Sequence, residues 1–394
     1  MHEERWLLPA GIEEVLPPEA QLVEGLRRDL LDLYRRWGYE LVIPPLIDYL
    51  ESLLTGTGHD LDLRTFKLTD QDSGRLLGIR ADMTPQVARI DAHHLRRSGP
   101  TRLCYLGTVL HTRSDGFAGT RSPLQIGAEI YGHRGAESDT EIIRLVILSL
   151  ELAGIPDIYL DLGHVGIYRG LARQAGLDPT RELELFGALQ RKAVPEVEAL
   201  IGAWGLAGDP ARMLLALAEL NGDDALERAG IVLAAAAPPV HRALDELRAI
   251  AEALRRWVPQ VPVHFDLAEL RGYHYKTGMV FAAFVPGWGQ EIARGGRYDD
   301  IGRVFGRARP AVGFSTDLKG LLHLGLGLQG RYAQPTAVLA PCRDDAALHE
   351  AVQALRAAGR RVIHELPGTD SGAQQLGCGE VLELHGGRWV LRPA

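Results

Sequence analysis

Between positions 124 and 131, apolar and polar side chains alternate strictly along the chain. One face would carry Leu124, Ile126, Ala128 and Ile130, and the other Gln125, Gly127, Glu129 and Tyr131. A period of two residues predicts a β-strand. Residues 102–110 also favour a strand, and the polar, turn-prone residues 113–121 separate the two segments. The pattern therefore predicts two antiparallel strands joined by a long loop.

The second face of this strand has two interpretations. Gln125 and Glu129 flank Gly127, and a glycine leaves room for another molecule to approach the backbone. This face could therefore form the floor of a small-molecule pocket. The alternative is a plain solvated face, which the periodicity alone favours.

Helical and strand-like spacing continues on both sides of this pair of strands. Apolar residues at helical intervals predict helices over residues 18–37 and 138–152. Pro44 and Pro45 follow a predicted strand that must end there or lie at a sheet edge, because proline cannot donate to a sheet. The strands expected around these helices cover residues 39–43, 65–68, 76–80, 157–163 and 263–267.

Changes in composition divide the chain into four segments. Residues 167–258 are rich in Ala, Leu, Glu and Arg at helical spacing, which predicts a helical insertion. The insertion interrupts a core whose two parts we expect in residues 1–166 and 259–325. A glycine-rich linker then precedes residues 331–394, where strand and helix patterns predict a small C-terminal α/β domain.

Composition and charge argue against several classes of protein. The 394 residues have a formal charge of −8, a pI of about 6.0 and no run of Lys or Arg, a poor basis for nucleic-acid binding. Three scattered cysteines without CxxC spacing argue against a disulfide framework or a zinc site. The sequence contains no signal-like or membrane-length apolar run, and we expect a soluble, cytoplasmic protein.

Asp82 and Thr84 stand at the start of a further predicted helix. Thr84 directly precedes Pro85, an arrangement typical of a first helical turn, so helix capping is the simpler role for both residues. The alternative is that the carboxylate and the hydroxyl receive the ammonium group of a ligand. His93 and His94 follow in the same helix, lack a metal-ligand partner and are expected at the surface.

Two later clusters combine glycine with groups that bind anions or rings. Residues 271–278 contain Arg271, which could bind a carboxylate, and tyrosines that could contact a flat ring. The alternative is a surface strand with aromatic pairs. In residues 294–297, a glycine pair precedes Arg297, which could bind an anion; the alternative is a tight hairpin bend.

Together, residues 6–325 resemble the catalytic core of the class II histidyl-tRNA synthetases. Residues 38–44 are similar to motif 1, the dimer element, 102–132 to motif 2, and 310–321 to motif 3. Arg271-Gly272 resembles the histidine-specific signature. The resemblance implies an α+β fold of the class II synthetase type, an antiparallel sheet flanked by helices, with the helical insertion and the small C-terminal α/β domain.

The positions that hold ATP in the resembled family are replaced. The synthetases use an Arg of motif 2 for the α-phosphate and an Arg of motif 3 for the γ-phosphate, where this chain has His111 and Gly320. Arg113 stands where the motif 2 loop has a Glu. Each missing transition-state contact lowers a rate by about 10²–10³. Two independent losses would make adenylation slower by a factor on the order of 10⁴–10⁶.

The positions that hold the amino acid largely match. The resemblance assigns the ligand ammonium to Asp82 with Thr84 and Gln125, the imidazole to Glu129, the carboxylate to Arg271, and the pocket sides to Tyr275 and Tyr298. Lys276 and His274 replace a signature Tyr and Asp, which leaves the contacts at the ring end open. This chain should therefore bind histidine without activating it.

This combination is similar to the regulatory subunits of ATP phosphoribosyltransferase, which are paralogues of the synthetases. The resemblance implies no catalysis, cofactor or metal. It implies a self-dimer that assembles with the short catalytic subunit, typically as a hetero-octamer, activates it in the first step of histidine biosynthesis and transmits inhibition by free histidine. Neither tRNA nor a membrane is an expected partner. The alternatives are an active histidyl-tRNA synthetase and an amino-acid-binding module attached to another partner.

Overall fold

The computed structural model describes residues 6–54, 59–114, 119–270, 272–273, 275–333, 335–368 and 372–394. The chain forms two compact units, of which the first ends at Leu328 and the second comprises Gln329–Ala394. Of the described helices, none has the length and apolar character needed to cross a bilayer. The division of the first unit into core and insertion, at the boundaries expected from the sequence, remains a prediction.

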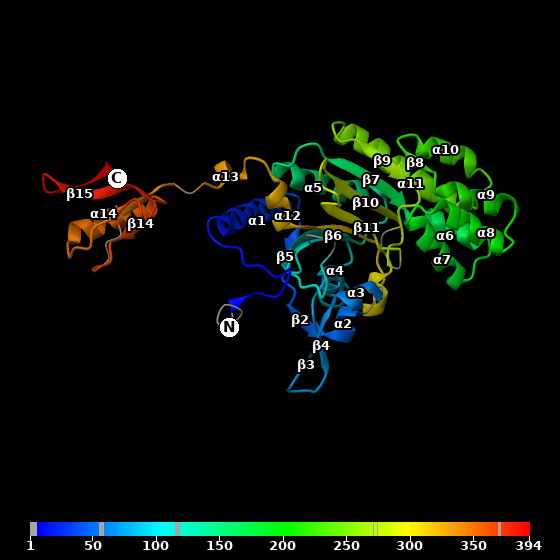
Figure 1. Ribbon diagram of the computed structural model, residues 1–394, viewed down its shortest axis with the longest axis horizontal. Helices are drawn as coiled ribbons and strands as arrows, with labels where there is room; N and C mark the ends of the chain where they lie inside the picture. The colour runs from blue at the N-terminus through cyan, green and yellow to red at the C-terminus, as the bar shows by residue number, and fades with distance from the viewer. Residues whose placement is uncertain are drawn as a thin grey trace. The chain divides into compact units, whose positions relative to one another are not determined.

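A mixed sheet of nine described strands forms the centre of the first unit, in the order β1-β5-β6-β12-β11-β10-β7-β9-β8 (Figure 1). From β5 to β7 all neighbouring strands are antiparallel, whereas β1 pairs with β5 and β9 pairs with β7 in parallel. The predicted antiparallel sheet is thus confirmed for its central strands. Its strands are β1 (Glu40–Leu41), β5 (Thr101–Thr108), β6 (Leu124–Tyr131), β7 (Tyr159–His164), β8 (Asn221–Gly222), β9 (Val263–Asp266), β10 (Met279–Phe284), β11 (Ala293–Arg297) and β12 (Ala311–Asp317).

The hairpin of β5 and β6 is the one predicted from the alternation, and its register places Tyr105 opposite Gly127 and Leu103 opposite Glu129. Its loop includes residues 115–118, which lie outside the described residues. Gln125 and Glu129 are buried, so the interpretation of the second face of β6 as a solvated surface is wrong. Side chains of Tyr105, Thr84 and Tyr298 cover Glu129 on that face, and Asp82 contacts Gln125 there.

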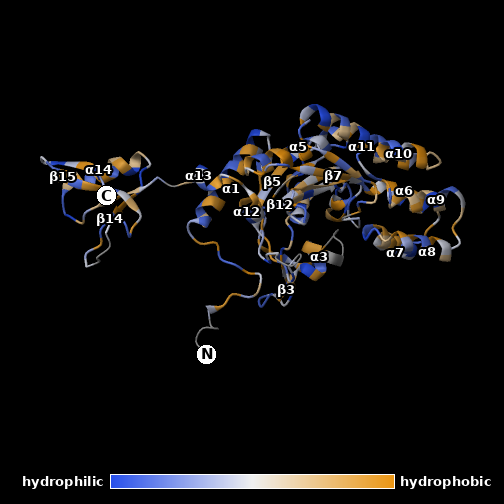
Figure 2. Cartoon of the chain, turned by 45° about the horizontal axis from the view of Figure 1, so that its top comes forward, coloured by the Kyte–Doolittle hydropathy of each residue, from blue (hydrophilic) through white to orange (hydrophobic). Residues whose placement is uncertain are grey.

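Amphipathic helices cover the sheet. The helices α5 (Ala136–Leu152), α11 (Pro238–Trp257) and α12 (Leu318–Leu324) pack against its strands, and α1 (Glu19–Arg36) packs on α5 and α12. Figure 2 shows orange and blue residues alternating around these helices, as expected when one side is buried. The helices predicted at 18–37 and 138–152 are confirmed.

A small three-stranded sheet in the order β2-β4-β3 leads into the first site residues. The strand predicted at 76–80 is β4, and α4 follows it directly, so Asp82 lies between them. The elements here are β2 (Ile47–Tyr49), α2 (Leu50–Leu54), α3 (His59–Arg64), β3 (Phe66–Thr69), β4 (Leu76–Ile79), α4 (Thr84–Arg89), a π-helical turn (Ile90–Leu95) and, later in the chain, a 3-10 turn (Ile301–Phe305).

Residues 165–257 gather at the β7 and β9 end of the sheet (Figure 1). The segment is helical except for β8, which pairs with β9 and extends the main sheet. The expectation of an all-helical segment is therefore wrong at this strand, since two residues carry no periodic signal. Before α11, its helices are α6 (Val165–Gln174), α7 (Pro179–Gln190), α8 (Val194–Ala203), α9 (Gly208–Leu217) and α10 (Ala225–Val232).

The second unit is a small α/β fold with strand order β14-β13-β15-β16. Its β15 and β16 form a hairpin around Gly386 and Gly387, which both have positive φ, as a two-residue hairpin turn requires. Val338, Leu348 and Leu382 contribute to its core. After α13 (Leu328–Arg331), its elements are β13 (Ala337–Ala340), α14 (Ala346–Ala357), β14 (Val362–His364), β15 (Cys378–His385) and β16 (Arg388–Pro393).

Arg297 ends β11 and is part of a buried ion pair. The glycine pair at 295–296 lies within this strand, so the hairpin-bend interpretation is wrong. The Arg297 guanidinium donates to Asp139 Oδ1 on α5 at 2.7 Å, and both side chains are 5 % exposed. Burial raises the pKa of Asp139 to about 6, against the opposing effect of Arg297. Arg297 thus joins the sheet to α5, and the expectation that it is available for an anionic ligand is wrong.

Replacing Arg297 by Ala should lower the free energy of unfolding by about 3–5 kcal/mol, because the Asp139 carboxyl group would stay buried without its partner. Chemical denaturation followed by circular dichroism measures this change. Arg303→Ala is the matched control: Arg303 pairs with Asp300 at the surface, and the loss should be within about 1 kcal/mol. Equal losses in the two variants would contradict a structural role for Arg297.

Candidate functional site

A cavity of about 250 Å³ lies above the middle of the main sheet. Of the seven residues expected to form the histidine site, five line it: Asp82, Thr84, Glu129, Tyr275 and Tyr298. Gln125 lines a neighbouring cavity of about 450 Å³, and Asp82 borders both. Arg271 lies outside the described residues. The chain folding therefore brings together residues that are more than two hundred positions apart in sequence.

Glu129 is the buried acid at the floor of this cavity. One of its oxygens accepts hydrogen bonds from the Tyr105 hydroxyl at 3.0 Å and the Thr84 hydroxyl at 3.3 Å, and the other accepts from the Tyr298 hydroxyl. Burial raises the pKa of Glu129 to about 8, although the Tyr105 hydrogen bond and the charge of Lys276 act in the opposite direction. The carboxyl group is thus held in place by three hydroxyls in a site that disfavours its charge.

Two glycines make room for this arrangement. A Cβ at Gly313, opposite Glu129 on β12, would lie 1.4 Å from Glu129 Oε2. A Cβ at Gly127 would lie 2.5 Å from the Tyr105 hydroxyl oxygen. The space beside Gly127 is therefore filled by the phenol of Tyr105, and the expectation that an outside molecule uses it is wrong. Tyr105 was not among the predicted site residues, although its position opposite Gly127 in the predicted hairpin indicated that its side chain could fill the space there.

Asp82 is oriented by its neighbours before α4. Its Oδ1 accepts hydrogen bonds from the Thr84 amide and from Gln125 Nε2, both at 2.9 Å. Gln125 Oε1 in turn accepts from the Met83 amide at 2.9 Å. Both ends of the Gln125 amide therefore position Asp82 and its loop, and within the described chain the second Asp82 oxygen, Oδ2, has no hydrogen-bond donor. One carboxylate thus has two roles: Oδ1 of Asp82 accepts a hydrogen bond from the first residue of α4, and Asp82 also lines the cavity.

Lys276 also faces the cavity and was not among the expected site residues. Its side chain is 7 % exposed, and its Nζ lies 5.1 Å from the centre of the Tyr298 ring and 5.3 Å from that of the Tyr275 ring. Burial lowers the pKa of Lys276 to about 8, against the attraction of Glu129 and Asp82. The sequence indicated Lys276 as a site residue only in that it has a lysine where the resembled signature has an aromatic residue.

His111, one of the two positions that bind ATP phosphates in the resembled synthetases, lines the neighbouring cavity. His111 is buried, and its ring contacts Arg64 Nη2 at 3.0 Å and the Ala81 carbonyl oxygen at 2.9 Å. Gly320 lies on α12, where an added Cβ would meet only Asp317 atoms, at 3.8 Å or more. Lys319, beside it, pairs with Glu13 at 3.1 Å. The side chains at both positions thus differ from phosphate-binding arginines.

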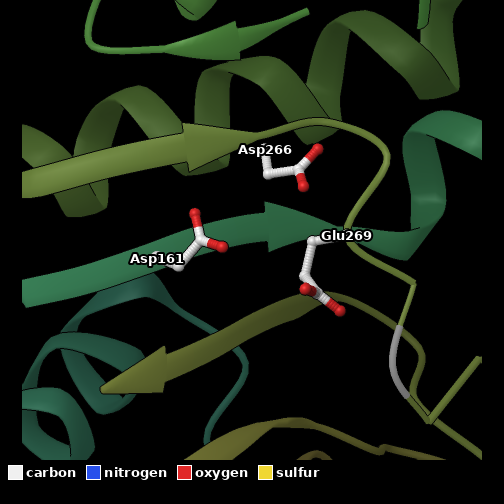
Figure 3. Close-up of side chains that lie close together, drawn as sticks. All are labelled: Asp161, Asp266 and Glu269. Atoms are coloured by element: carbon white, nitrogen blue, oxygen red, sulfur yellow. The ribbon is translucent and has the colours of Figure 1, made fainter. Parts of the chain in front are cut away.

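Three acidic side chains lie near the β7–β9 end of the sheet (Figure 3). Oxygen atoms of Asp161, Asp266 and Glu269 lie within 4.8 Å of one another. Lys192 Nζ lies 2.6 Å from Asp266, and His264 Nδ1 lies 2.8 Å from Asp161. Because two of the three carboxylates already have such partners, the cluster is explained by the protein's own groups and we assign no metal to it.

Comparison with protein families identifies two regions. Residues 11–321 match the family model described as Histidyl-tRNA synthetase. Residues 335–392 match the model described as ATP phosphoribosyltransferase subunit HisZ C-terminal domain. The second match covers most of the second compact unit, and the first covers nearly all of the unit that contains the two cavities.

Individual relatives match over nearly the whole chain. The ATP phosphoribosyltransferase regulatory subunit of Thioalkalivibrio sulfidiphilus is 62% identical over 379 residues, covering 96% of this chain and 95% of the relative. That of Alkalilimnicola ehrlichii is 57% identical over 395 residues, covering 99% and 98%.

Solved structures agree with this relationship. A Bacillus halodurans structure described as an ATP phosphoribosyltransferase regulatory subunit/histidyl-tRNA synthetase superposes with a TM-score of 0.83 at 26% identity, covering 95% of this chain and 97% of that one. A Nostoc histidyl-tRNA synthetase, at 19% identity and a TM-score of 0.77 over 98% and 97% of the chains, shares the fold. The chain therefore belongs to the family of ATP phosphoribosyltransferase regulatory subunits, built on the histidyl-tRNA synthetase fold.

Proposed function

We propose that this chain is a non-catalytic subunit that binds free histidine in the 250 Å³ cavity and transmits inhibition by histidine to a short ATP phosphoribosyltransferase subunit, which it also activates. The observation that carries the proposal is the difference between the two cavities. The first has a buried, hydrogen-bonded carboxyl group and an oriented Asp82. The second is lined by His111, and neither His111 nor Gly320 is the arginine that holds phosphate in the resembled synthetases.

The size and polarity of the first cavity suit one amino acid. Its volume lies below the range of about 300–1,000 Å³ that is typical of pockets for drug-sized ligands. Asp82 Oδ2 can receive the ligand ammonium, and Glu129 can receive the imidazole at the opposite end. Tyr275 and Tyr298 offer ring faces and edges to a flat side chain. Arg271 is the proposed partner of the ligand carboxylate.

The second cavity favours binding without activation of the amino acid. An Arg at position 111 would have to displace the contacts of His111 with Arg64 and Ala81. The absence of both phosphate-binding arginines removes groups that hold a triphosphate for attack, each worth about 10²–10³ in rate. The runner-up function, an active histidyl-tRNA synthetase, is favoured by the family match to residues 11–321 and predicts histidine-dependent exchange of pyrophosphate with ATP.

Assembly is part of the same proposal. The names of the relatives support a catalytic partner subunit, and a hetero-octamer is the proposed form. An exposed apolar segment supports a self-dimer: Leu41, Ile43, Leu46 and Ile47 are all exposed, and β1 is an edge strand of the main sheet. An exposed edge and a row of apolar side chains favour coverage by another chain, here a second copy. We propose no tRNA partner.

Inhibition by histidine requires a difference in affinity between two arrangements of the complex, because a ligand that binds both equally shifts nothing. A coupling free energy of about 1–3 kcal/mol would be sufficient for feedback. The cavity wall offers a connection to the helical segment: Arg169 of α6 donates to the Lys276 carbonyl oxygen at 2.7 Å. A ligand that moves the backbone at Lys276 would therefore act on α6.

Replacing Asp82 by Asn should weaken histidine binding roughly 10- to 100-fold, because it removes a charge-assisted hydrogen bond worth about 1.5–3 kcal/mol while keeping the side-chain shape. Replacing Glu129 by Gln should also weaken binding, because an amide cannot ionise when the ligand and Lys276 stabilise a carboxylate at this position. Isothermal titration calorimetry measures the affinities, and thermal unfolding checks the fold. Glu252→Gln, at an exposed position of α11, is the control and should bind as the wild type does. Unchanged affinity in both site variants would refute the pocket assignment.

Restoring arginine at positions 111 and 320 should still give little adenylation. Gly320→Arg has space, but His111→Arg competes with Arg64 for a buried position. We expect the rate of pyrophosphate exchange in the double variant to stay at least about a hundred-fold below that of an active histidyl-tRNA synthetase assayed in parallel. Efficient exchange in the double variant would show that the two arginines alone separate the functions, and exchange by the wild type would establish the synthetase alternative.

The free energy of unfolding should depend on pH through Glu129 and Lys276, the two cavity residues with shifted pKa values. Glu129 has a pKa of about 8 when folded, above its ordinary 4.5, so the folded state binds more protons and is destabilised as pH rises from 4.5 to 8. Lys276 has a pKa of about 8, below its ordinary 10.5, so stability from this group increases as pH rises from 8 to 10.5. Each group can change the free energy of unfolding by at most about 1.4 kcal/mol per pH unit.

In a plot of the free energy of unfolding against pH, Glu129→Gln should therefore reduce the slope between pH 4.5 and 8. Lys276→Met should reduce the slope between pH 8 and 10.5. Urea unfolding at a series of pH values measures both slopes. Profiles of the two variants that run parallel to that of the wild type would contradict the assignment of these pKa shifts to the cavity pair.

A further inference from the structure

Lys276 is a buried ammonium group that has no hydrogen-bond acceptor among the described residues. Its Nζ lines the cavity beside the rings of Tyr275 and Tyr298, and a Cβ at Gly296 would lie 3.3 Å from it. It forms neither a hydrogen bond nor an ion pair with any residue that the structure describes. A buried polar group of this kind is costly unless it has a partner. The group is therefore aimed at an acceptor that a ligand would supply.

Glu129 stands across the same cavity as the complementary group. Both residues line the cavity, and among the described residues no hydrogen bond or ion pair joins them, although the charge of Lys276 acts on Glu129. Tyr105 on β5 contacts Glu129. The charged and titratable groups that line the cavity with Lys276 come from several elements, namely Glu129 on β6, Asp82 before α4, Arg294 on β11, Arg64 on α3, Glu269, Tyr273, Tyr275 and Tyr298.

The neutral imidazole ring has the matching pair of groups, because one ring nitrogen donates a hydrogen bond and the other accepts one. We propose that Lys276 is a specificity residue: it donates to the unprotonated ring nitrogen of bound histidine while Glu129 accepts from the ring N–H, so that the cavity selects neutral histidine side chains and excludes imidazolium. The proposal rests on the histidine site proposed above and adds the charge state of its ligand.

Electrostatics favours this arrangement over binding of the imidazolium. A protonated ring would direct an N–H group at the Lys276 ammonium, and like charges in a site shielded from water repel strongly. A neutral ring placed between the two groups instead stabilises the ammonium and the ionised carboxylate together. An amino acid with a cationic side chain, such as lysine or arginine, meets the same repulsion and should be rejected.

The pH dependence of histidine affinity tests the proposal. With an imidazole pKa near about 6.5, the neutral fraction falls roughly tenfold between about pH 7.5 and about pH 5.5, and the affinity of the wild type for histidine should fall by the same factor. In Lys276→Met the fall should disappear or reverse, since an imidazolium can then pair with Glu129. Lys67→Met, a lysine that pairs with Asp62 outside the cavity, should keep the wild-type profile.

A ligand control separates titration of histidine from titration of the protein. A triazole analogue of histidine keeps the donor and the acceptor on its ring but stays neutral throughout this pH range, so the wild type should bind it with nearly constant affinity. This comparison uses the unaltered protein and does not depend on the folding of a variant. Calorimetry with both ligands at both pH values completes the experiment.

The outcomes are distinguishable. Histidine binding to the wild type at constant affinity over this pH range would overturn the proposal for Lys276 and leave the histidine site standing. The same conclusion would follow if the profile of Lys276→Met superposed on that of the wild type, or if the triazole analogue lost affinity as steeply as histidine. No histidine binding at either pH would refute the proposed function, and the role of Lys276 with it.

Discussion

One buried carboxyl group, that of Glu129, constrains the architecture of the whole cavity. It lies inside a nine-stranded sheet, where an unpaired polar group would be strongly destabilising. Hydroxyls of Tyr105, Thr84 and Tyr298 reach it from three different elements. Gly313 must lack a side chain because Glu129 fills that space. These requirements fix the order and spacing of the elements around a small polar chamber that the core does not fill.

We propose that the two cavities separate binding of the amino acid from its activation, which a synthetase combines. The chamber around Glu129 keeps a set of groups suited to a zwitterionic ligand. The adjoining cavity is lined by His111, which other groups already contact, and Gly320 on α12 is the second position where the resembled synthetases have a phosphate-binding arginine. Tyr273 and Lys276 join this chamber to the helical segment through Arg169, which donates to the carbonyl oxygens of both and whose guanidinium carbon lies 4.5 Å from the centre of the Tyr273 ring. A ligand-dependent signal therefore has a contiguous structural connection, although a regulatory coupling needs two arrangements of the complex.

The elements with regular spacing could be predicted from sequence, and the contacts within the site could not. The alternation in residues 124–131, with the strand-like residues before it, was sufficient to predict the hairpin of β5 and β6. Helical periodicity was sufficient to predict α1 and α5. The roles of Gln125 and Gly127 depended on which neighbour came close: Gln125 positions Asp82, and Tyr105 fills the space at Gly127. Arg297 looked available for an anion because its partner, Asp139, is 158 positions away. Lys276 stood out only as a departure from a signature, and its orientation toward the cavity required the fold.

The most direct measurement of the central claim is the activity of a short ATP phosphoribosyltransferase catalytic subunit with this protein added, with and without histidine. We expect that the protein raises the rate, that histidine lowers the rate of the complex, and that Glu129→Gln keeps the activation while requiring more histidine for inhibition. A catalytic subunit that is equally active without this protein, or a complex whose response to histidine is unchanged by Glu129→Gln, would contradict it.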